Sequence, residues 1–138
     1  MAASLQDPAA REILTLTQHL LDVIAAGDYA RYTELSASDV TSFEPEACGH
    51  LVEGLPFHKH YFDLFKQQAS VYQGNQIICS PHIRFCGPDV AIISYVRVQQ
   101  NGYTTRRSEE TRVWHRQEGT WRQVHFHRSS PQNAFPAP

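Results

Sequence analysis

The sequence predicts a single α+β domain in which helices pack on one face of a strongly curved antiparallel sheet. Residues of the first half recur at helical spacing, whereas apolar and polar residues alternate with period two in most of the second half. Turn-forming pairs such as Asn101-Gly102 separate the alternating segments. At 138 residues, the chain has the length of one domain with one core.

Two helices are expected at the start of the chain. Asp7 and Pro8 are a typical helix start, because Asp can accept a first-turn N–H and proline at the first helical position loses no hydrogen bond. Gly27 can end this helix in the left-handed conformation, and Asp28 can cap a shorter helix followed by a polar loop at 36–39. The expected buried face of the long helix consists of Ile13, Thr17, Leu20, Leu21 and Ile24.

One more helix, four strands and at most one short additional strand are expected after that loop. Residues 41–43 form a short strand at best, because Pro45 cannot donate to a ladder. Helical spacing returns from Pro56 to about Ala69, with His58 and Phe62 beside an apolar face made of Phe57, Tyr61, Leu64 and Phe65. The later strands are expected at 76–85, at 90–98 and as a pair within 108–128, joined by turns at 86–89, 101–102 and 118–119.

The folded domain is expected to cover residues 9–130, with a flexible lead at 1–8 and a flexible, proline-containing tail at 131–138. Twelve basic against 14 acidic residues give no basic footprint for nucleic acid. No apolar stretch approaches the ~20 residues that span a bilayer, so we expect no membrane partner. Three cysteines without a C-x-x-C pair are interpreted as reduced core thiols of a cytoplasmic protein: Cys48, Cys79 and Cys86.

The register of the last two strands follows from a two-residue turn at Glu118-Gly119. It predicts one face on which Arg112 pairs with His125, Glu110 with His127, and Trp114 with Gln123. The opposite face then carries Thr111, Val113, Val124 and Phe126. On the preceding strand the side chains of Ile93, Tyr95 and Arg97 share a face, because strand side chains alternate with period two.

Arg97 lies mid-strand between apolar neighbours, where a buried unpaired guanidinium would be costly. We therefore expect a carboxylate partner or a bound anion in a pocket on the concave side of the sheet. The alternative is a cross-strand Arg–Glu network on a solvated face, where exposed charge pairs contribute little.

Two kinds of chemistry are considered for the polar residues. His125, His127 and Glu110 could supply three zinc ligands, but a fourth ligand at a usual spacing is lacking, so core or network histidines and no metal or other cofactor are expected. A closed pocket could perturb four groups towards acid–base catalysis, namely Glu44, Tyr32, His58 and Tyr95. The sequence holds no G-x-S-x-G, P-loop, dinucleotide-binding or kinase motif.

A series of motifs extends in order along most of the chain. The most specific is Ser108-Glu109-Glu110-Thr111-Arg112-Val113-Trp114-His115-Arg116, which continues into Gly119-x-Trp121 and the run 124–128. Earlier members are the runs 43–47, 51–54, 57–58, 61–62 and 81–82, and Tyr95-x-Arg97. From about Arg11 to Ser129, the sequence closely resembles the association (hub) domain of the type II calcium/calmodulin-dependent protein kinases.

This resemblance implies the cone-shaped fold of nuclear transport factor 2 and the ketosteroid isomerases. It also implies a non-catalytic domain that assembles into rings, with itself as partner in about ten or more copies, and gathers kinase subunits that carry a matching hub. By the same resemblance, arginines in a deep cleft bind small carboxylates. The matching ligand-binding residues here are Arg97, Arg112 and Arg128, with His58, Glu44, Tyr32 and Tyr95 around them.

The resemblance and the predicted register disagree about Arg128. A two-residue turn without a bulge puts Arg128 on the face opposite Arg112, and a one-residue shift would be needed to bring the two together. The chain also differs from the family at Phe65-Lys66, where the family has a Trp near the cleft mouth, so the presence of a flap there stays open. Neither a kinase domain nor a basic calmodulin-target helix precedes Asp7, so the chain is either an excised domain or a free-standing relative.

Three functions compete at this point. The first is a hub. Closed rings need heterologous contacts between subunits, and exposed aromatic residues such as Trp114 and Trp121 could contribute to these contacts. The second is an isomerase or dehydratase on the same fold, with Glu44 as its best general base. The third is a sensor whose small carboxylate ligand, anchored by Arg97, biases assembly.

Overall fold

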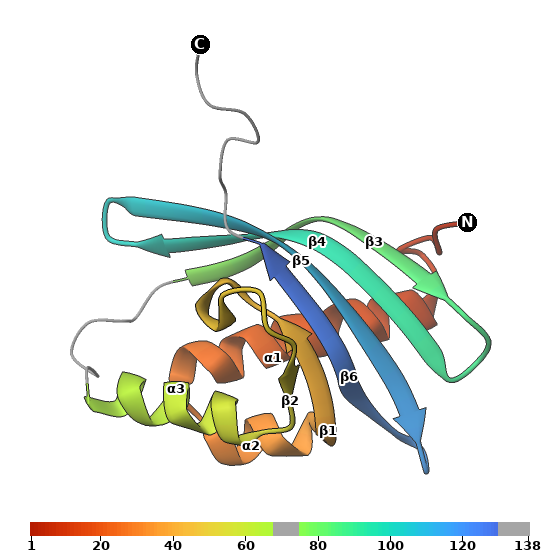
Figure 1. Ribbon diagram of the computed structural model, residues 1–138. Helices are drawn as coiled ribbons and strands as arrows, with labels where there is room; N and C mark the ends of the chain where they lie inside the picture. Colours follow the sequence, from red (N-terminus) through yellow and green to blue (C-terminus); the bar gives the residue numbers. More distant parts are fainter. Residues whose placement is uncertain (68–74, 130–138) are drawn as a thin grey trace.

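The computed structural model describes residues 1–67 and 75–129 and places the helices on one side of a six-stranded sheet (Figure 1). The strands lie in the order β2-β1-β6-β5-β4-β3. The α+β class is therefore confirmed. In chain order the elements are α1 (Pro8–Ala26), α2 (Tyr29–Glu34), β1 (Ser36–Phe43), a 3-10 turn (Pro45–Ala47), β2 (Val52–Glu53), α3 (Pro56–Gln67), β3 (Asn75–Phe85), β4 (Val90–Asn101), β5 (Thr104–Gln117) and β6 (Thr120–Ser129).

Helix α1 has the limits that its sequence predicts and most of the predicted buried face, although Ile24 is only partly buried and Val23 is buried beside it. The Asp7 side chain accepts a hydrogen bond from the backbone N–H of Ala9, and Gly27 ends the helix at φ 69°. Thr17 is fully buried, and its hydroxyl accepts a hydrogen bond from the indole N–H of Trp114 at 3.0 Å. This bond ties the helix to the middle of β5.

Strand β1 is longer than the sequence predicts. Instead of a polar loop at 36–39 and a short strand at 41–43, residues 36–43 form one strand that pairs in parallel with β6. The polar residues of this strand find partners in the sheet: Gln123 donates to the Ser36 hydroxyl at 2.8 Å. Because this pairing is parallel, the sheet is mixed rather than wholly antiparallel.

A β-bulge changes the register between β5 and β6. The two-residue turn at Glu118-Gly119 is confirmed, and Trp114 pairs with Gln123 as expected. Beyond the bulge the pairs shift by one residue, so the predicted partners of Arg112 and Glu110 were wrong. Arg112 pairs with Phe126 rather than His125, and Glu110 pairs with Arg128 rather than His127.

The same shift exchanges the faces of the last residues of β6. Phe126, which was expected on the far face from Arg112, is buried on the same face. Arg128 likewise lies on the same side of the sheet as Arg112. The family resemblance requires this placement, whereas the register without a bulge puts Arg128 on the opposite side.

Helix α3 buries a different face from the one predicted. His58 and Phe62 are buried, whereas Leu64 is 38% exposed. The rotation has a polar cause, because His58 forms a hydrogen bond with Glu44 at 3.0 Å and so faces the sheet. The end of the predicted helix at 68–69 and the predicted tail at 131–138 lie outside the described residues, and the flap near Phe65 remains untested.

The core lies between α1, α2 and the inner face of the sheet, which is the face that the helices cover (Figure 1). Trp114 and Trp121 belong to this core, at 0% and 9% exposure, so they do not form the aromatic surface patch suggested from the sequence. The expectation of core thiols was wrong: Cys48 and Cys86 are exposed and Cys79 is partly buried. Among the described helices, none is long and apolar enough to cross a membrane.

Candidate functional site

A buried carboxylate joins the two arginines of β4 and β5. Arg112 donates from Nη2 to Glu110 Oε1 at 2.7 Å, and Arg97 donates from Nη1 to Glu110 Oε2 at 3.3 Å. Side-chain exposure is 0% for Glu110, 2% for Arg112 and 8% for Arg97. The pairing is therefore a buried ion network and not the solvated surface network that was the alternative.

Neutral side chains accept further hydrogen bonds from the two guanidinium groups. Arg97 Nε donates to Gln76 Oε1 at 2.7 Å, and Arg112 Nη1 donates to Gln123 Oε1 at 2.6 Å. Arg112 Nε donates to the Tyr95 hydroxyl at 2.9 Å, and that hydroxyl donates in turn to Glu110 at 3.3 Å. Each arginine is thus fixed by several bonds, which reduces the cost of burying its charge.

The Phe126 ring adds a further contact on the inner face. The Cζ atom of Arg112 lies 4.5 Å from the centre of this ring, which is within the range of a cation–π interaction. The bulge in β6 makes this contact possible, because it is what turns Phe126 toward Arg112.

The network keeps its charges. Burial by itself would raise the pKa of Glu110, but Arg112 and Arg97 together hold that pKa below its ordinary value. Burial would lower the pKa of Arg112, but Tyr95 and Glu110 raise it above its ordinary value. Burial lowers the pKa of Arg97 below its ordinary value, and Glu110 opposes this effect. Two guanidinium groups therefore share one carboxylate, and the network carries one positive charge in excess.

A second polar cluster lies where β1, α3 and β6 meet. Glu44 accepts from the Ser42 hydroxyl at 2.9 Å and is 3.0 Å from His58 Nε2. Arg128 Nη2 lies 3.8 Å from Glu44 and forms its shorter ion pair with Glu46. Burial would raise the pKa of Glu44, but its hydrogen bonds with His58 and Ser42 lower that pKa below 4.5.

Tyr32 lies between the two clusters. Its ring is 2% exposed and meets the His58 ring edge-on, with 5.7 Å between ring centres. Burial raises the pKa of Tyr32 to about 12, which Arg112 only partly opposes, so the phenol is neutral at physiological pH. His58 Nδ1 is buried and has no hydrogen-bond partner among the described residues.

The structure brings the predicted site residues together in two groups. Arg97, Arg112 and Tyr95 surround Glu110, His58 and Arg128 lie beside Glu44, and Tyr32 lies between the two groups. Sequence reasoning missed the central role of Glu110, although its position two residues before Arg112 on the same strand face was a usable signal. The partners Gln76 and Gln123 gave no such signal. The possible zinc set does not converge, because Glu110 lies on the inner face while His125 and His127 lie on the outer face.

Three comparisons place the chain among known proteins. A family model described as the calcium/calmodulin dependent protein kinase II association domain matches residues 9–132. The chain is 44% identical over 126 residues to the calcium/calmodulin-dependent protein kinase type II subunit delta of Oryctolagus cuniculus. That match covers 86% of this chain and 23% of the relative, so the chain spans under a quarter of the relative's length.

Solved structures match over nearly their whole length. The Chlamydamonas reinhardtii CamKII hub homology domain aligns with a TM-score of 0.83 at 43% identity, covering 90% of this chain and 99% of that chain. The association domain of C. elegans CaMKII aligns with a TM-score of 0.80 at 36% identity, covering 92% and 100%. An NTF2-like protein from Pseudomonas putida, with a TM-score of 0.68 at 18% identity over 93% of this chain and 91% of its own, shares the fold alone.

Proposed function

The chain belongs to the family of calcium/calmodulin dependent protein kinase II association domains, and on that basis we propose that it is a non-catalytic hub that assembles with copies of itself. The assembly is a closed ring or a stacked double ring of about ten or more subunits. Where kinase subunits with a matching hub are present, the assembly would gather them. The observation that carries this proposal is the full-length match to two hub structures at 36% and 43% identity.

The candidate bases of an enzyme are already engaged, and this favours the hub over an isomerase or dehydratase. Glu44, the best candidate for a general base, is held by Ser42 and His58 and lies near Arg128. Glu110 is held between two guanidinium groups that keep it ionised. A general base needs a carboxylate that can take a proton near neutral pH, and both of these have pKa values lowered by their partners.

The mass in solution tests the hub proposal. At neutral pH and micromolar concentration, we expect sedimentation or light scattering to give a mass of about ten or more 15.7-kDa subunits. A protein that stays monomeric or dimeric at these concentrations would contradict it.

We further propose that the arginine network can bind a small carboxylate. Its support is the excess positive charge of two buried guanidinium groups that share one carboxylate. A ligand carboxylate would add a second anion beside Arg97 and Arg112, and Arg128, whose side chain is 23% exposed, lies nearest to solvent.

Calorimetry with acetate and succinate tests the ligand proposal. We expect an Arg97→Ala variant to lose binding and an Arg106→Ala variant, which changes an exposed arginine of β5, to bind like the unmodified chain. Because Arg97→Ala leaves Glu110 with one partner fewer, Arg97→Lys serves as a milder second variant that keeps the charge but loses the planar fork. Equal binding by all four proteins would exclude Arg97 as the anchor.

A further inference from the structure

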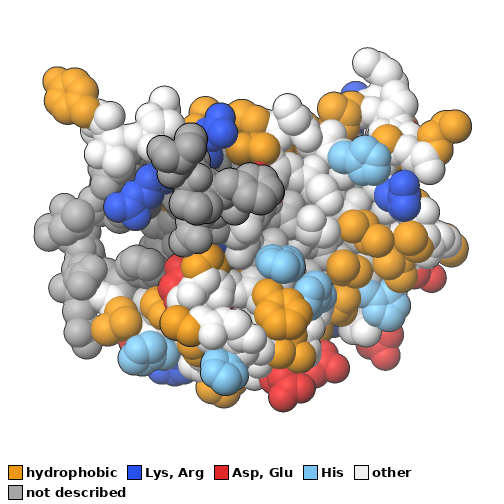
Figure 2. Space-filling model, turned by 45° about the horizontal axis from the view of Figure 1, so that its top comes forward, with side chains coloured by type: hydrophobic (Ala, Val, Ile, Leu, Met, Phe, Trp, Pro, Cys, Tyr) orange, Lys and Arg blue, Asp and Glu red, His pale blue; other side chains and the backbone are white. Residues whose placement is uncertain are grey.

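The outer face of the sheet, which points away from the helices, is not covered by any helix of the described part of the chain (Figure 1). The pairings of the strands place on its centre a set of small, apolar and imidazole side chains. In Figure 2, histidine and hydrophobic side chains lie next to one another on the face turned to the viewer. The central residues are Ser94, Val96, Thr111, Val113, His125 and His127.

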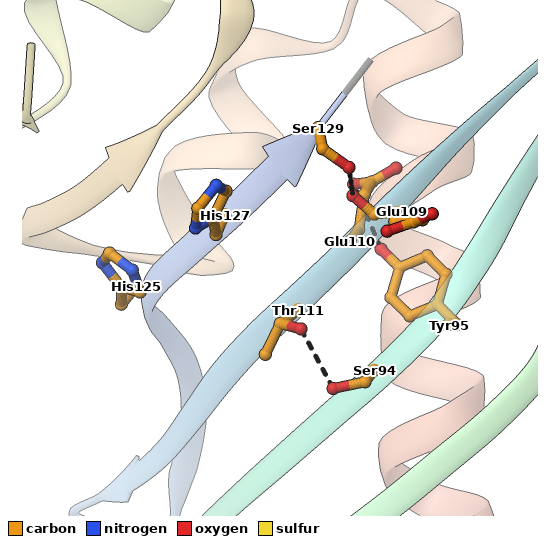
Figure 3. A pocket seen from close by; sticks show the side chains of 8 residues that line it. All are labelled: Ser94, Tyr95, Glu109, Glu110, Thr111, His125, His127 and Ser129. Carbon is orange, nitrogen blue, oxygen red and sulfur yellow. Dashed lines mark hydrogen bonds between the residues drawn. The ribbon is translucent and has the colours of Figure 1, made fainter. Parts of the chain in front are cut away.

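The six central residues carry no permanent charge, and three of them, Ser94, Thr111 and His125, have side-chain hydrogen bonds within the same face. The hydroxyls of Ser94 and Thr111 lie 3.0 Å apart, and the Thr41 hydroxyl lies 2.7 Å from His125 Nδ1. A depression of about 600 Å³ lies between β4, β5 and β6 (Figure 3). Its lining includes Ser94, Thr111, His125 and His127, together with Tyr95, Glu109, Glu110 and Ser129. Because the hydrogen bonds of the Ser94, Thr111 and Thr41 hydroxyls are internal, covering these hydroxyls costs little desolvation free energy.

Charged residues of both signs surround this neutral centre. Glu109 pairs with Val96 and Arg84 pairs with Ile92, so both side chains lie on the outer face. Two apolar side chains at opposite sides of the face are exposed, Phe43 at 39% and Ile77 at 47%. A neutral centre with a charged rim is the usual anatomy of a protein–protein interface. The other charged rim residues are Arg107, Arg122 and Glu53.

The charge pattern selects a second copy of this chain as the occupant. A face with a neutral centre does not repel its own copy, and a rim that carries both arginine and glutamate offers each copy partners of opposite charge. We propose that a second copy packs on this outer face and that protonation of His125 and His127 weakens the contact. The proposal rests on the hub function, since it names the surface and the control of the same assembly.

The pH dependence follows from what the two imidazoles face. From β1, Thr41 and Phe43 contact them: the Phe43 ring centre lies 6.3 Å from that of His125 and 5.6 Å from that of His127. From β5, Val113 and Thr111 are opposite, and neither carries a charge. The titratable or charged groups further out on the same face are His82 and Arg84 on β3, Arg107, Glu109 and His115 on β5, Arg122 on β6 and Glu53 on β2.

Burial already lowers the pKa of His125, and the neighbouring His127 adds to this effect. A covering copy would remove more water and lower the pKa again, because the charged form loses its hydration. The assembled chain then binds fewer protons than the separate chain. Assembly through this face is therefore favoured above the ordinary His pKa of about 6.5 and is lost as the pH falls below it.

Light scattering at pH 7.5 and pH 5.5 tests the inference, with circular dichroism to check the fold. We expect the unmodified chain to lose at least half of its mass at pH 5.5 while keeping its helical and strand signal. A His125→Gln, His127→Gln double variant should keep its mass at both pH values, because it cannot be protonated at these positions. His60→Gln changes an exposed histidine of α3 and should behave like the unmodified chain.

The outcomes separate this inference from the hub proposal. A chain that assembles at pH 7.5 and keeps the same mass at pH 5.5 would overturn the inference and leave the hub function standing. A double variant that still dissociates at pH 5.5 would have the same two consequences. A chain that is monomeric at both pH values would contradict the hub function itself. His127→Gln alone, at an exposed position, should show a smaller shift and guards against misfolding of the double variant.

Discussion

The two faces of the sheet differ in where they carry charge: beside the apolar core, the inner face buries a network of charged groups, whereas the outer face carries its charged groups around a neutral centre. The inner face, covered by helices, holds a buried network of charged groups around Glu110. The outer face, free of helices among the described residues, is neutral at its centre and carries Ser94, Thr111 and His125. Sheets with one covered face normally bury apolar residues and expose charged ones. Buried charge indicates a built site, and an uncharged open face indicates a contact surface.

The two faces should therefore respond to different perturbations. Changes on the inner face should affect the free energy of unfolding, because the network is buried inside the subunit. Changes on the outer face should affect the assembly and leave the subunit folded. All unfolding experiments below are compared at one protein concentration, because assembly itself adds to the apparent stability.

The largest effect is expected from removal of the central carboxylate of the inner face. Glu110→Ala leaves Arg97 and Arg112 buried without their shared anion, and we expect a loss of about 3–5 kcal/mol in the free energy of unfolding. Urea unfolding measures this loss. Glu12→Ala, which removes an exposed carboxylate of α1, is the matched control and should change stability by no more than about 0.5 kcal/mol. A loss below about 1 kcal/mol for Glu110→Ala would show that the network is dispensable.

A smaller, pH-dependent effect is expected at Glu44. Its folded-state pKa lies below 4.5, so the folded chain binds fewer protons there than the unfolded chain. The contribution of Glu44 is therefore complete above the unfolded pKa and is lost as the pH falls through the folded pKa. We expect Glu44→Gln to cost about 1.5–3 kcal/mol at pH 6 and to flatten the decline in stability on acidification.

Unfolding curves between pH 6 and pH 3 measure the effect, with Glu12→Gln as the control. Parallel pH profiles for Glu44→Gln and the unmodified chain would contradict a stabilising role for the ionised Glu44. The comparison of faces also predicts two separate acid transitions: loss of assembly near the ordinary His pKa, then loss of folding below about 4.5.

The smallest effect is expected from one hydroxyl of the inner network. Tyr95→Phe removes an acceptor for Arg112 and a donor to Glu110 while the ring remains, and should cost about 1 kcal/mol in the free energy of unfolding. Tyr103→Phe is the control, since Tyr103 is fully exposed. If both changes have equal effects, the Tyr95 hydroxyl contributes nothing to the network.

The sequence allowed the local features to be predicted and not those set by distant partners. Helix α1, with its Asp7 cap and Gly27 stop, depends on neighbouring residues and was right. The partner of Arg97 was right in kind, because the cost of a buried guanidinium requires an anion. The 36–43 strand was missed because its parallel partner lies more than 80 residues away, at Gln123 and beyond.

Two errors on the inner face have the same physical origin. The extra residue in β6 is a bulge that the turn chemistry does not signal, and it alone decides that Arg128 and Phe126 share the side of Arg112. The rotation of α3 reflects the bond between His58 and Glu44, since a paired histidine can take a buried position that apolar spacing assigns to Phe57.

The most direct test of the division between the two faces is the mass of a Val113→Glu variant, measured beside its circular dichroism. Val113 lies at the centre of the outer face, opposite His125 and Ile92. We expect a folded subunit with a native spectrum whose mass at pH 7.5 falls well below that of the unmodified chain, while Thr120→Glu at the exposed β5–β6 turn keeps the assembly. A Val113→Glu variant that assembles to the unmodified mass would contradict the assignment of assembly to this face.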